Sequence, residues 1–230
     1  MLMKPSDHEK VRAAVETAEQ RTSGEIVCVL ARRSSDYWEV PLSFAAGVAV
    51  LAPAILVLSG FRLPQGMDLL SGWTIAHVSA VDVAVGHALR TYVLAQAALF
   101  VAVVAVAWLP GVRFVLAPMG LKHDRVRRRA EEQFAARGLH LTKGRTGVLI
   151  FASLAERRAE VIADEAIASK VTPDAWVEVL APLLAGMKSR DPGSGFAGSI
   201  GRAADLLALH FPRAPDDENE LPDTVIELDR

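Results

Sequence analysis

The chain has 230 residues, of which 51% are hydrophobic and 23% charged, and its formal net charge at pH 7 is −2. So small a net charge offers no bulk attraction to a polyanion, and we therefore expect no nucleic-acid partner. The single cysteine, Cys28, excludes an intrachain disulfide and a cysteine-based zinc cage. The first 21 residues are polar and charged, which predicts no cleaved signal peptide.

The amino-terminal part of the chain predicts one helix followed by one strand. Ser6 and Glu9 have the spacing of a capping box, in which two side chains satisfy backbone donors at a helix start. After Gly24, the apolar run Glu25–Ala31 predicts a buried strand. Cys28 lies inside that strand, so we expect a packing role for its thiol rather than a catalytic one. The polar stretch from Arg32 to Glu39 then leaves the domain, whose first part we place at residues 6–40.

Two long apolar runs without a charged residue follow, Leu42–Phe61 and Thr91–Val112. At about 1.5 Å of rise per residue, either run is long enough to cross a hydrocarbon core of about 30 Å. We therefore predict a transmembrane hairpin over residues 42–112; the alternative for each run is a buried core helix. Pro53 would kink the first span, as membrane helices tolerate.

The segment between the two runs, residues 62–90, is predicted to be an extracytoplasmic loop with an interfacial helix over residues 69–89. A third span there would bring His77, Asp82 and His87 into the bilayer, where ionisable groups are costly. Three spans would also place the two predicted buried strands, residues 25–31 and 147–152, on opposite sides of the membrane.

Basic residues are concentrated on the termini side of both runs. Arg32 and Arg33 precede the first run, whereas the loop offers only Arg62 and Arg90. The positive-inside rule then places both termini in the cytoplasm. A cluster after the second run comprises Arg113, Lys122, Arg125, Arg127, Arg128 and Arg129. The members of this cluster from Lys122 onwards have two interpretations. They contact anionic lipid, or they form a solvated helix face that also acts as a topology signal.

The carboxy-terminal half predicts a helix and a β-hairpin. Lys122–Arg137 has an apolar stripe and ends before Gly138, a common helix stop. Gly147–Ala152 and Ala159–Asp164 predict two strands joined by a reversal at Leu154–Arg158. The order strand, helix, strand then implies a parallel pair with a right-handed crossover, into which the transmembrane hairpin would be inserted.

The remaining sequence predicts two more helices and a tail. Thr172 and Pro173 mark the start of a helix, residues 191–195 read as a loop, and Phe196–Phe211 reads as the last helix. We place the second part of the domain at residues 121–212. Residues 213–230 predict an acidic exposed tail, with Val225–Leu228 as an alternative edge strand.

Motifs of established chemistry are missing from the sequence. It has no P-loop, no dinucleotide fingerprint, no Gly-x-Ser-x-Gly elbow and no paired histidine spacing. Gly193-Ser194-Gly195 is a weak mimic of a phosphate loop, and a plain flexible loop is favoured. We name no catalytic residue.

Several motifs resemble the TPM domain family, over about residues 6–40 and 121–212. The resemblance implies a compact α/β sandwich with a small mixed sheet, here in the bacterial membrane-anchored branch in which a transmembrane pair interrupts the domain. Some relatives are associated with photosystem repair, acid phosphatase activity and calcium or magnesium binding. The matching residues are Ala130–Phe134, Gly138-Leu139, Thr142, Arg145–Phe151, Glu156–Arg158, Val161–Asp164, Trp176, Phe211-Pro212 and Asn219–Pro222.

Three carboxylates are candidates for a calcium or magnesium site. Asp164 falls where the family carries an acidic strand end near its reported metal region, Glu165 follows it, and Asp174 opens the next helix. A hard cation needs several such oxygens to converge. Asp174 has an alternative role, complementing a helix dipole.

Three functions follow as expectations. The first is a non-catalytic interaction, assembly or quality-control module for membrane proteins, held in the bacterial inner membrane by two spans and working with a protein partner at the membrane. The second is a weak calcium- or magnesium-dependent phosphatase of the TPM family. The third is a sensor of anionic lipid surfaces that uses the basic side chains of Lys122, Arg125, Arg127, Arg128 and Arg129.

Overall fold

The computed structural model describes residues 2–59, 80–215 and 219–229. The chain divides into two compact units. The first combines Met1–Ser35 with Met119–Arg230, and the second is Asp36–Pro118. The first unit is therefore assembled from segments on both sides of the second.

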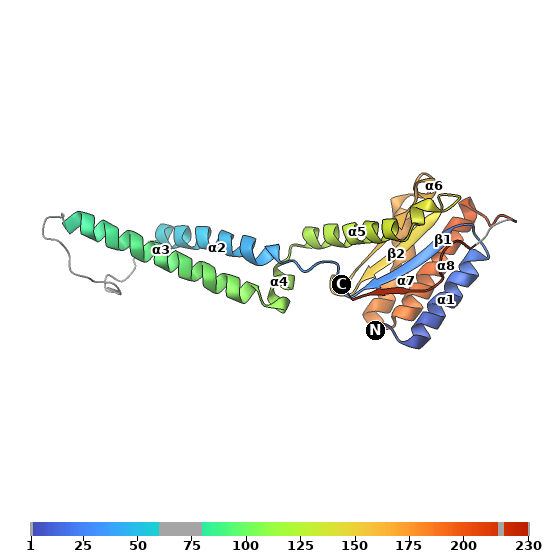
Figure 1. The fold of residues 1–230 in the computed structure, drawn as a ribbon, viewed down its shortest axis with the longest axis horizontal. Helices are drawn as coiled ribbons and strands as arrows, with labels where there is room; N and C mark the ends of the chain where they lie inside the picture. The colour runs from blue at the N-terminus through green and yellow to red at the C-terminus, as the bar shows by residue number, and fades with distance from the viewer. Residues whose placement is uncertain (1, 60–79, 216–218, 230) are drawn as a thin grey trace. The chain divides into compact units, whose positions relative to one another are not determined.

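A mixed four-stranded sheet forms the centre of the first unit, in the order β3-β2-β1-β4 (Figure 1). β1 and β2 are parallel, with Glu25 opposite Gly147 and Ala31 opposite Ser153, and β2 and β3 are antiparallel. This confirms the predicted buried strand and the predicted hairpin. The strands are β1 (Glu25–Ala31), β2 (Gly147–Ser153), β3 (Arg158–Ala163) and β4 (Ile226–Leu228).

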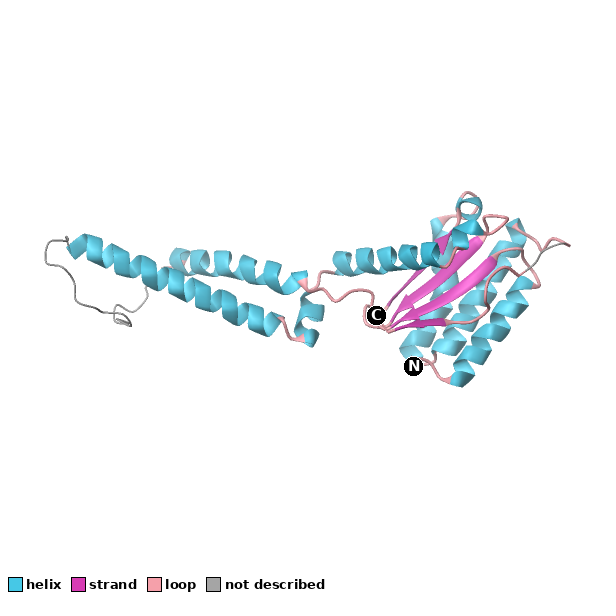
Figure 2. Cartoon of the chain, in the orientation of Figure 1, coloured by secondary structure: helices cyan, strands magenta, loops and turns pink. Residues whose placement is uncertain are grey.

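Helices cover both faces of this sheet, as Figure 2 shows. Helices α1, α7 and α8 lie on one face and α5 lies on the other. Coverage on both sides explains why every residue of β1 and β2 is buried and why both strands read as continuous apolar runs. The helices of this unit are α1 (Pro5–Glu19), α5 (Met119–Ala136), α6 (Glu165–Ala168), α7 (Pro173–Ser189) and α8 (Pro192–His210), with a 3₁₀ turn at Leu139–Leu141.

Alternate residues of β1 enter two different cores. Cys28 and Leu30 pack in the cluster that contains α1, α7 and α8, whereas Val27 and Val29 pack against α5. Burial raises the pKa of the Cys28 thiol far above its usual range, so the reactive thiolate is scarce at neutral pH. The expected packing role of Cys28 therefore fits its position.

The first helix begins differently from the sequence prediction. The capping box at Ser6 and Glu9 is wrong, because α1 already begins at Pro5, with Lys4 as its cap residue. Asp7 supplies the reciprocal contact: its carboxylate accepts a hydrogen bond from the Lys4 backbone N–H at 3.3 Å. Proline at the first helical position has a preset φ and lacks an N–H that would go unpaired there, so it moves the helix start towards the amino terminus.

The predicted loop at residues 191–195 is also wrong. α8 begins at Pro192, and the Asp191 carboxylate caps it by accepting from Ser194 N at 3.1 Å. The glycines of its first turn are explained by close packing: a Cβ on Gly193 would lie 2.7 Å from Asp7, and one on Gly195 would lie 3.1 Å from Gly186. The weak phosphate-loop pattern is therefore a place where helices approach closely.

The end of the chain is partly ordered into the sheet. β4 pairs in parallel with β1, with Val29 opposite Ile226, so the edge-strand alternative is confirmed and the prediction of a wholly exposed tail is wrong. Glu227 joins the two ends of the chain: its carboxylate accepts from Leu2 N at 2.7 Å and Met3 N at 2.9 Å and faces His8 Nε2 at 2.9 Å. Burial raises the pKa of Glu227, but these contacts outweigh it and the net pKa is lowered.

The second unit contains two helices that are long and apolar enough to span a membrane, over Glu39–Leu56 and Leu89–Ala107. They lie in α2 (Glu39–Leu58) and α3 (Ala80–Ala107), and a short α4 (Pro110–Leu116) follows. α2 continues through Pro53. Gln96 Nε2 of α3 donates to the Ala49 carbonyl of α2 at 3.3 Å.

The limits of the second predicted span need correction. α3 begins at Ala80, inside the predicted loop, and ends at Ala107, before the predicted end at Val112. The chain breaks there because Pro110, which cannot continue a helix from within, starts α4 instead. Most of the predicted loop with its interfacial helix, and the end of the first run at Phe61, lie outside the described residues.

We predict that Gly186→Ala destabilises the first unit strongly, because α7 and α8 touch at this glycine. A Cβ there would lie 2.5 Å from Gly195 Cα, a backbone atom that can move only with its helix. We expect a loss of about 2–3 kcal/mol of folding free energy. Gly201→Ala in α8 is the matched control. Nothing lies within 4 Å of its added Cβ, and alanine should stabilise the helix by about 0.5–1 kcal/mol. The melting temperatures of the two variants test this prediction. Equal melting temperatures would contradict the close contact between α7 and α8.

Candidate functional site

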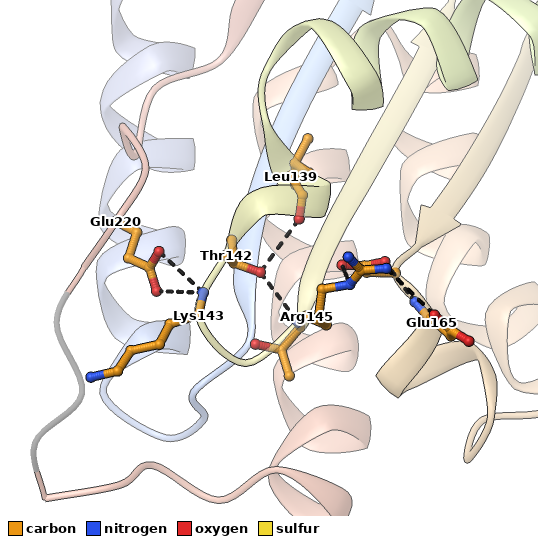
Figure 3. A network of polar contacts seen from close by, with 8 residues as sticks. Leu139, Thr142, Lys143, Arg145, Glu165 and Glu220 are labelled. Carbon is orange, nitrogen blue, oxygen red and sulfur yellow. Dashed lines mark hydrogen bonds and ion pairs between the residues drawn. The ribbon is translucent and has the colours of Figure 1, made fainter.

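Arg145 brings two of the predicted metal-site carboxylates together at the amino end of β2. Because β2 and β3 are antiparallel, the residues before β2 lie beside those after β3. Arg145 Nε lies 3.3 Å from Asp164 Oδ2, and its Nη2 lies 3.4 Å from Glu165 Oε2 (Figure 3). The third candidate, Asp174, is an exposed residue in the first turn of α7.

The carboxylates of Asp164 and Glu165 have structural partners. Asp164 caps α6, and its Oδ1 accepts from Glu165 N at 2.7 Å. Its buried Oδ2 has no hydrogen bond, a feature that favours a cation, but the positive guanidinium of Arg145 already occupies that side. Among the described residues, no three His, Cys, Asp or Glu side chains gather as a metal site would require. In this arrangement the residues offer too few oxygens for a hard cation, because Ca²⁺ takes about six to eight. The metal site predicted from the sequence therefore stays a prediction that a metal titration must test.

The neighbouring polar contacts close the loop before β2, as Figure 3 shows. Thr142 Oγ1 donates to the Leu139 carbonyl at 3.4 Å and accepts from Thr146 N at 3.2 Å. The Lys143 N–H donates to the Glu220 carboxylate at 3.2 and 3.3 Å. These bonds satisfy backbone groups that would otherwise lack partners, so this end of the sheet is closed by structural contacts.

The basic run on α5 is partly neutralised. Arg127 Nε lies 3.0 Å from Glu131 Oε1, and Arg129 Nη1 lies 3.0 Å from Glu132 Oε2. Lys122 is buried rather than solvated. Exposed pairs one helical turn apart stabilise a helix only slightly, but they reduce the charge available to a lipid surface. The lipid contact through this run stays a prediction.

The opposite end of β2 is locked onto the carboxyl end of β1. Leu154 N donates to the Ala31 carbonyl at 3.0 Å, and Ala155 N donates to the Arg32 carbonyl at 2.9 Å. The buried Glu156 carboxylate accepts from Ser34 N at 3.1 and 3.2 Å and also from the Ser153 hydroxyl. The turn between β2 and β3 is therefore held rigidly at the carboxyl end of two parallel strands.

A cationic pocket of about 420 Å³ lies at this turn. In open α/β sheets, ligands bind outside the carboxyl ends of the strands. The pocket is formed by the turn, the start of β3 and the last turns of α7. Its lining residues are Ser153, Leu154, Arg157, Arg158, Ala159, Leu184, Met187, Lys188 and Arg190.

Two of the lining arginines have a left-handed backbone. Arg157 has φ 53° and Arg190 has φ 60°, a region that glycine tolerates and that costs other residues about 1–2 kcal/mol. Within the described residues, neither arginine makes an ion pair. Arg158 is less free, because it lies near half-buried Glu160, whose pKa is raised by burial and only partly lowered again by the charges of His123, Arg127 and Arg158. Lys188 also stands in the last turn of α7, where a cation complements the helix dipole.

The sequence prediction missed this pocket. It treated Leu154–Arg158 as a reversal and named neither Lys188 nor Arg190. Two adjacent arginines in a turn are the local signal that was available. Their convergence with the end of α7 could not be read from sequence, because it depends on how α7 packs against β3.

Comparisons with known proteins support the fold. No family model matches the chain, and no curated protein matches it. The structure is similar to the NMR structure of the BA42 protein from the psychrophilic bacterium Bizionia argentinensis, with a TM-score of 0.54 and 17% sequence identity. The match covers 98% of this chain and 94% of that chain. At this identity the similarity shows a shared fold.

We predict that calcium and magnesium leave the melting temperature of the full chain unchanged, because Arg145 already balances Asp164 and Glu165. Asp164→Asn keeps the side-chain shape and the capping oxygen, so it should cost at most about 1 kcal/mol. The two proteins are melted side by side in neutral detergent while each metal is titrated. A metal-dependent rise that is present in the wild type and absent in Asp164→Asn would establish the cation site.

Proposed function

We propose that the protein is a membrane-anchored interaction module that assists the assembly or quality control of other membrane proteins, and that its first unit is a TPM-like domain. The observation that carries this proposal is the place of the two apolar helices. α2 and α3 lie in the chain between β1 and β2, which pair with each other. A partner-binding domain is thereby tied to two candidate spans through connections at both ends.

The exposure of these helices supports insertion into lipid. Of the two candidate spans, 22% of the first and none of the second is buried within the protein. Val50 is 65% exposed and Val101 64%. Exposing apolar surface to water costs about 25 cal/mol per Å², and a hydrocarbon environment removes that cost. A core helix of a soluble protein would instead be covered by its own chain.

The charge distribution supports the orientation of the anchor. Arg32 and Arg33 precede α2, and Arg113 follows α3. Cytoplasmic flanks of membrane helices are enriched in such residues. We therefore propose two spans in a bacterial inner membrane, with both termini in the cytoplasm.

Exposed apolar side chains of the first unit give positions at which a protein partner can be tested. Val177 on α7 is 65% exposed and Leu209 on α8 is 78% exposed. Single exposed apolar residues are common on soluble domains, so their value here lies in offering defined positions for a test.

A second candidate is a weak calcium- or magnesium-dependent phosphatase. The TPM resemblance implies it, and the cationic pocket offers charges that suit a phosphate ester. Among the residues that the structure describes, we assign no nucleophile for such a reaction. A lipid-surface sensor that uses Lys122–Arg129 is the third candidate, and the ion pairs on α5 weaken it.

We predict that the full chain stays in the membrane fraction after alkaline carbonate extraction. A variant in which a Gly/Ser linker replaces residues 36–118 should be soluble and fold cooperatively, since long loops cost little closure entropy.

Reporter fusions after residues 36 and 140 should read as cytoplasmic, and one at residue 75 as external. Release of the full chain by carbonate would refute the anchor, and an external signal at residue 140 would refute the orientation.

We predict that a photo-crosslinker placed at Val177 captures one or a few membrane proteins in intact cells. Thr17, an exposed polar position on α1, provides the matched control. An interaction module should give discrete adducts from Val177 and none from Thr17, and the linker variant should lose them because it is no longer held at the membrane. Identical patterns from both positions would contradict a specific partner surface on α7.

A further inference from the structure

We propose that the cationic pocket at the carboxyl end of β2 binds the phosphate group of a phosphomonoester, supplied either by an anionic lipid headgroup or by a soluble ester. This assignment deepens the proposed function, because it gives the module a chemical ligand. Its lipid source rests on the proposed membrane anchor, whereas phosphate recognition itself does not.

The charges of the pocket suit a doubly charged anion. The described lining contains no acidic residue, and it brings the side chains of Arg157, Lys188 and Arg190 to one concave surface. A guanidinium offers paired N–H donors that match two phosphate oxygens, and a lysine adds a compact point charge. The neighbouring carboxylate of Glu156 accepts hydrogen bonds from the Ser34 N–H and the Ser153 hydroxyl, and it is not part of the lining.

The shape and the walls of the pocket support the same ligand. Its volume of about 420 Å³ lies within the range of about 300–1,000 Å³ of small-molecule sites. Leu184 and Met187 form apolar walls beside the cations. Low-dielectric walls focus the field of nearby charges, which raises the local concentration of a counter-ion.

The backbone at Arg157 and Arg190 is the second, independent observation. Both residues hold a positive φ that glycine would adopt without strain. Each of these positions therefore carries an arginine at a local conformational cost. A requirement for the two guanidinium groups explains that choice, and two such arginines line the same pocket.

The course of the chain favours a lipid headgroup as one source. The turn that forms the pocket is bound to Ala31 and Arg32 at the carboxyl end of β1, and this is where the chain leaves the first unit. Glu39, the first residue of α2, follows eight residues after Ala31, a span of at most about 28 Å. If α2 enters a membrane as proposed, phosphate headgroups lie within reach of that tether.

The first test measures phosphate binding by the full chain in neutral detergent, which does not require membrane insertion. Inorganic phosphate and glycerol 3-phosphate are titrated by calorimetry, with acetate as a singly charged comparison. We expect saturable binding of both phosphates that weakens with added salt. The double variant Arg157→Gly/Arg190→Gly should weaken it at least about tenfold, while its melting temperature is maintained or raised because glycine relieves the left-handed backbone.

Arg145→Gly is the matched control. Arg145 also has a positive φ, 54°, and its replacement removes one positive charge at the amino end of β2, outside the lining of the pocket. Its phosphate affinity should equal that of the wild type. If the double variant binds phosphate as tightly as the wild type, or if no phosphate binds at all, the proposal is overturned.

The second test distinguishes the two sources. The full chain is reconstituted in nanodiscs of phosphatidylcholine alone or with phosphatidic acid, and hydrogen exchange is followed at residues 184–190. Slower exchange with phosphatidic acid, lost in the double variant, supports the lipid headgroup. Phosphate binding in detergent with unchanged exchange in nanodiscs supports a soluble ester and overturns the lipid source. Failure of the chain to enter nanodiscs would count against the proposed anchor, and the detergent titration would still decide on the pocket.

Discussion

The pairing of β1 with β2 is the interaction on which the rest of the structure depends. Both strands are buried along their whole length, so their backbone N–H and C=O groups must find partners within the sheet. A parallel pair cannot be closed by a tight turn and needs a long crossover. In this chain the crossover contains α2 and α3 as well as α5. Closure entropy rises by only about 0.6 kcal/mol for each doubling of loop length, so the inserted helices weaken the pair little.

The two ends of β2 have different chemistry, which follows from what each end must satisfy. At the amino end, Arg145 neutralises Asp164 and Glu165, and backbone donors of the preceding loop are bonded internally. At the carboxyl end, the Glu156 carboxylate holds the turn by accepting a hydrogen bond from the Ser34 N–H, while Arg157 and Arg190 make no ion pair in the described part of the chain. The contacts at the first end stabilise the fold, and the second end carries the pocket for which we propose a phosphate ligand.

Much of the fold could be predicted because its signals are local. The limits of β1 were predicted to the residue, and those of the hairpin to within one residue, because buried strands read as short apolar runs between polar segments. The wrong predictions lie where packing outweighed local preference. Residues 191–195 read as a loop since glycines disfavour helix, but the close approach of α8 to α7 requires them there. β4 was only an alternative, because a short edge strand is defined by its partner.

The sequence by itself determined the apolar runs of α2 and α3, the buried strands and the end of α5 before Gly138. Each of these features depends on neighbours a few residues away. It also indicated that the two halves form one domain, since each lacked a sheet without the other. Only the tertiary structure decided the candidate site. Arg157 and Arg190 line one pocket because β3 follows a tight turn and α7 packs against it, and Asp164 lies beside a guanidinium because an arginine from before β2 reaches it. Such encounters join residues far apart in the chain, and no local pattern of side chains records them.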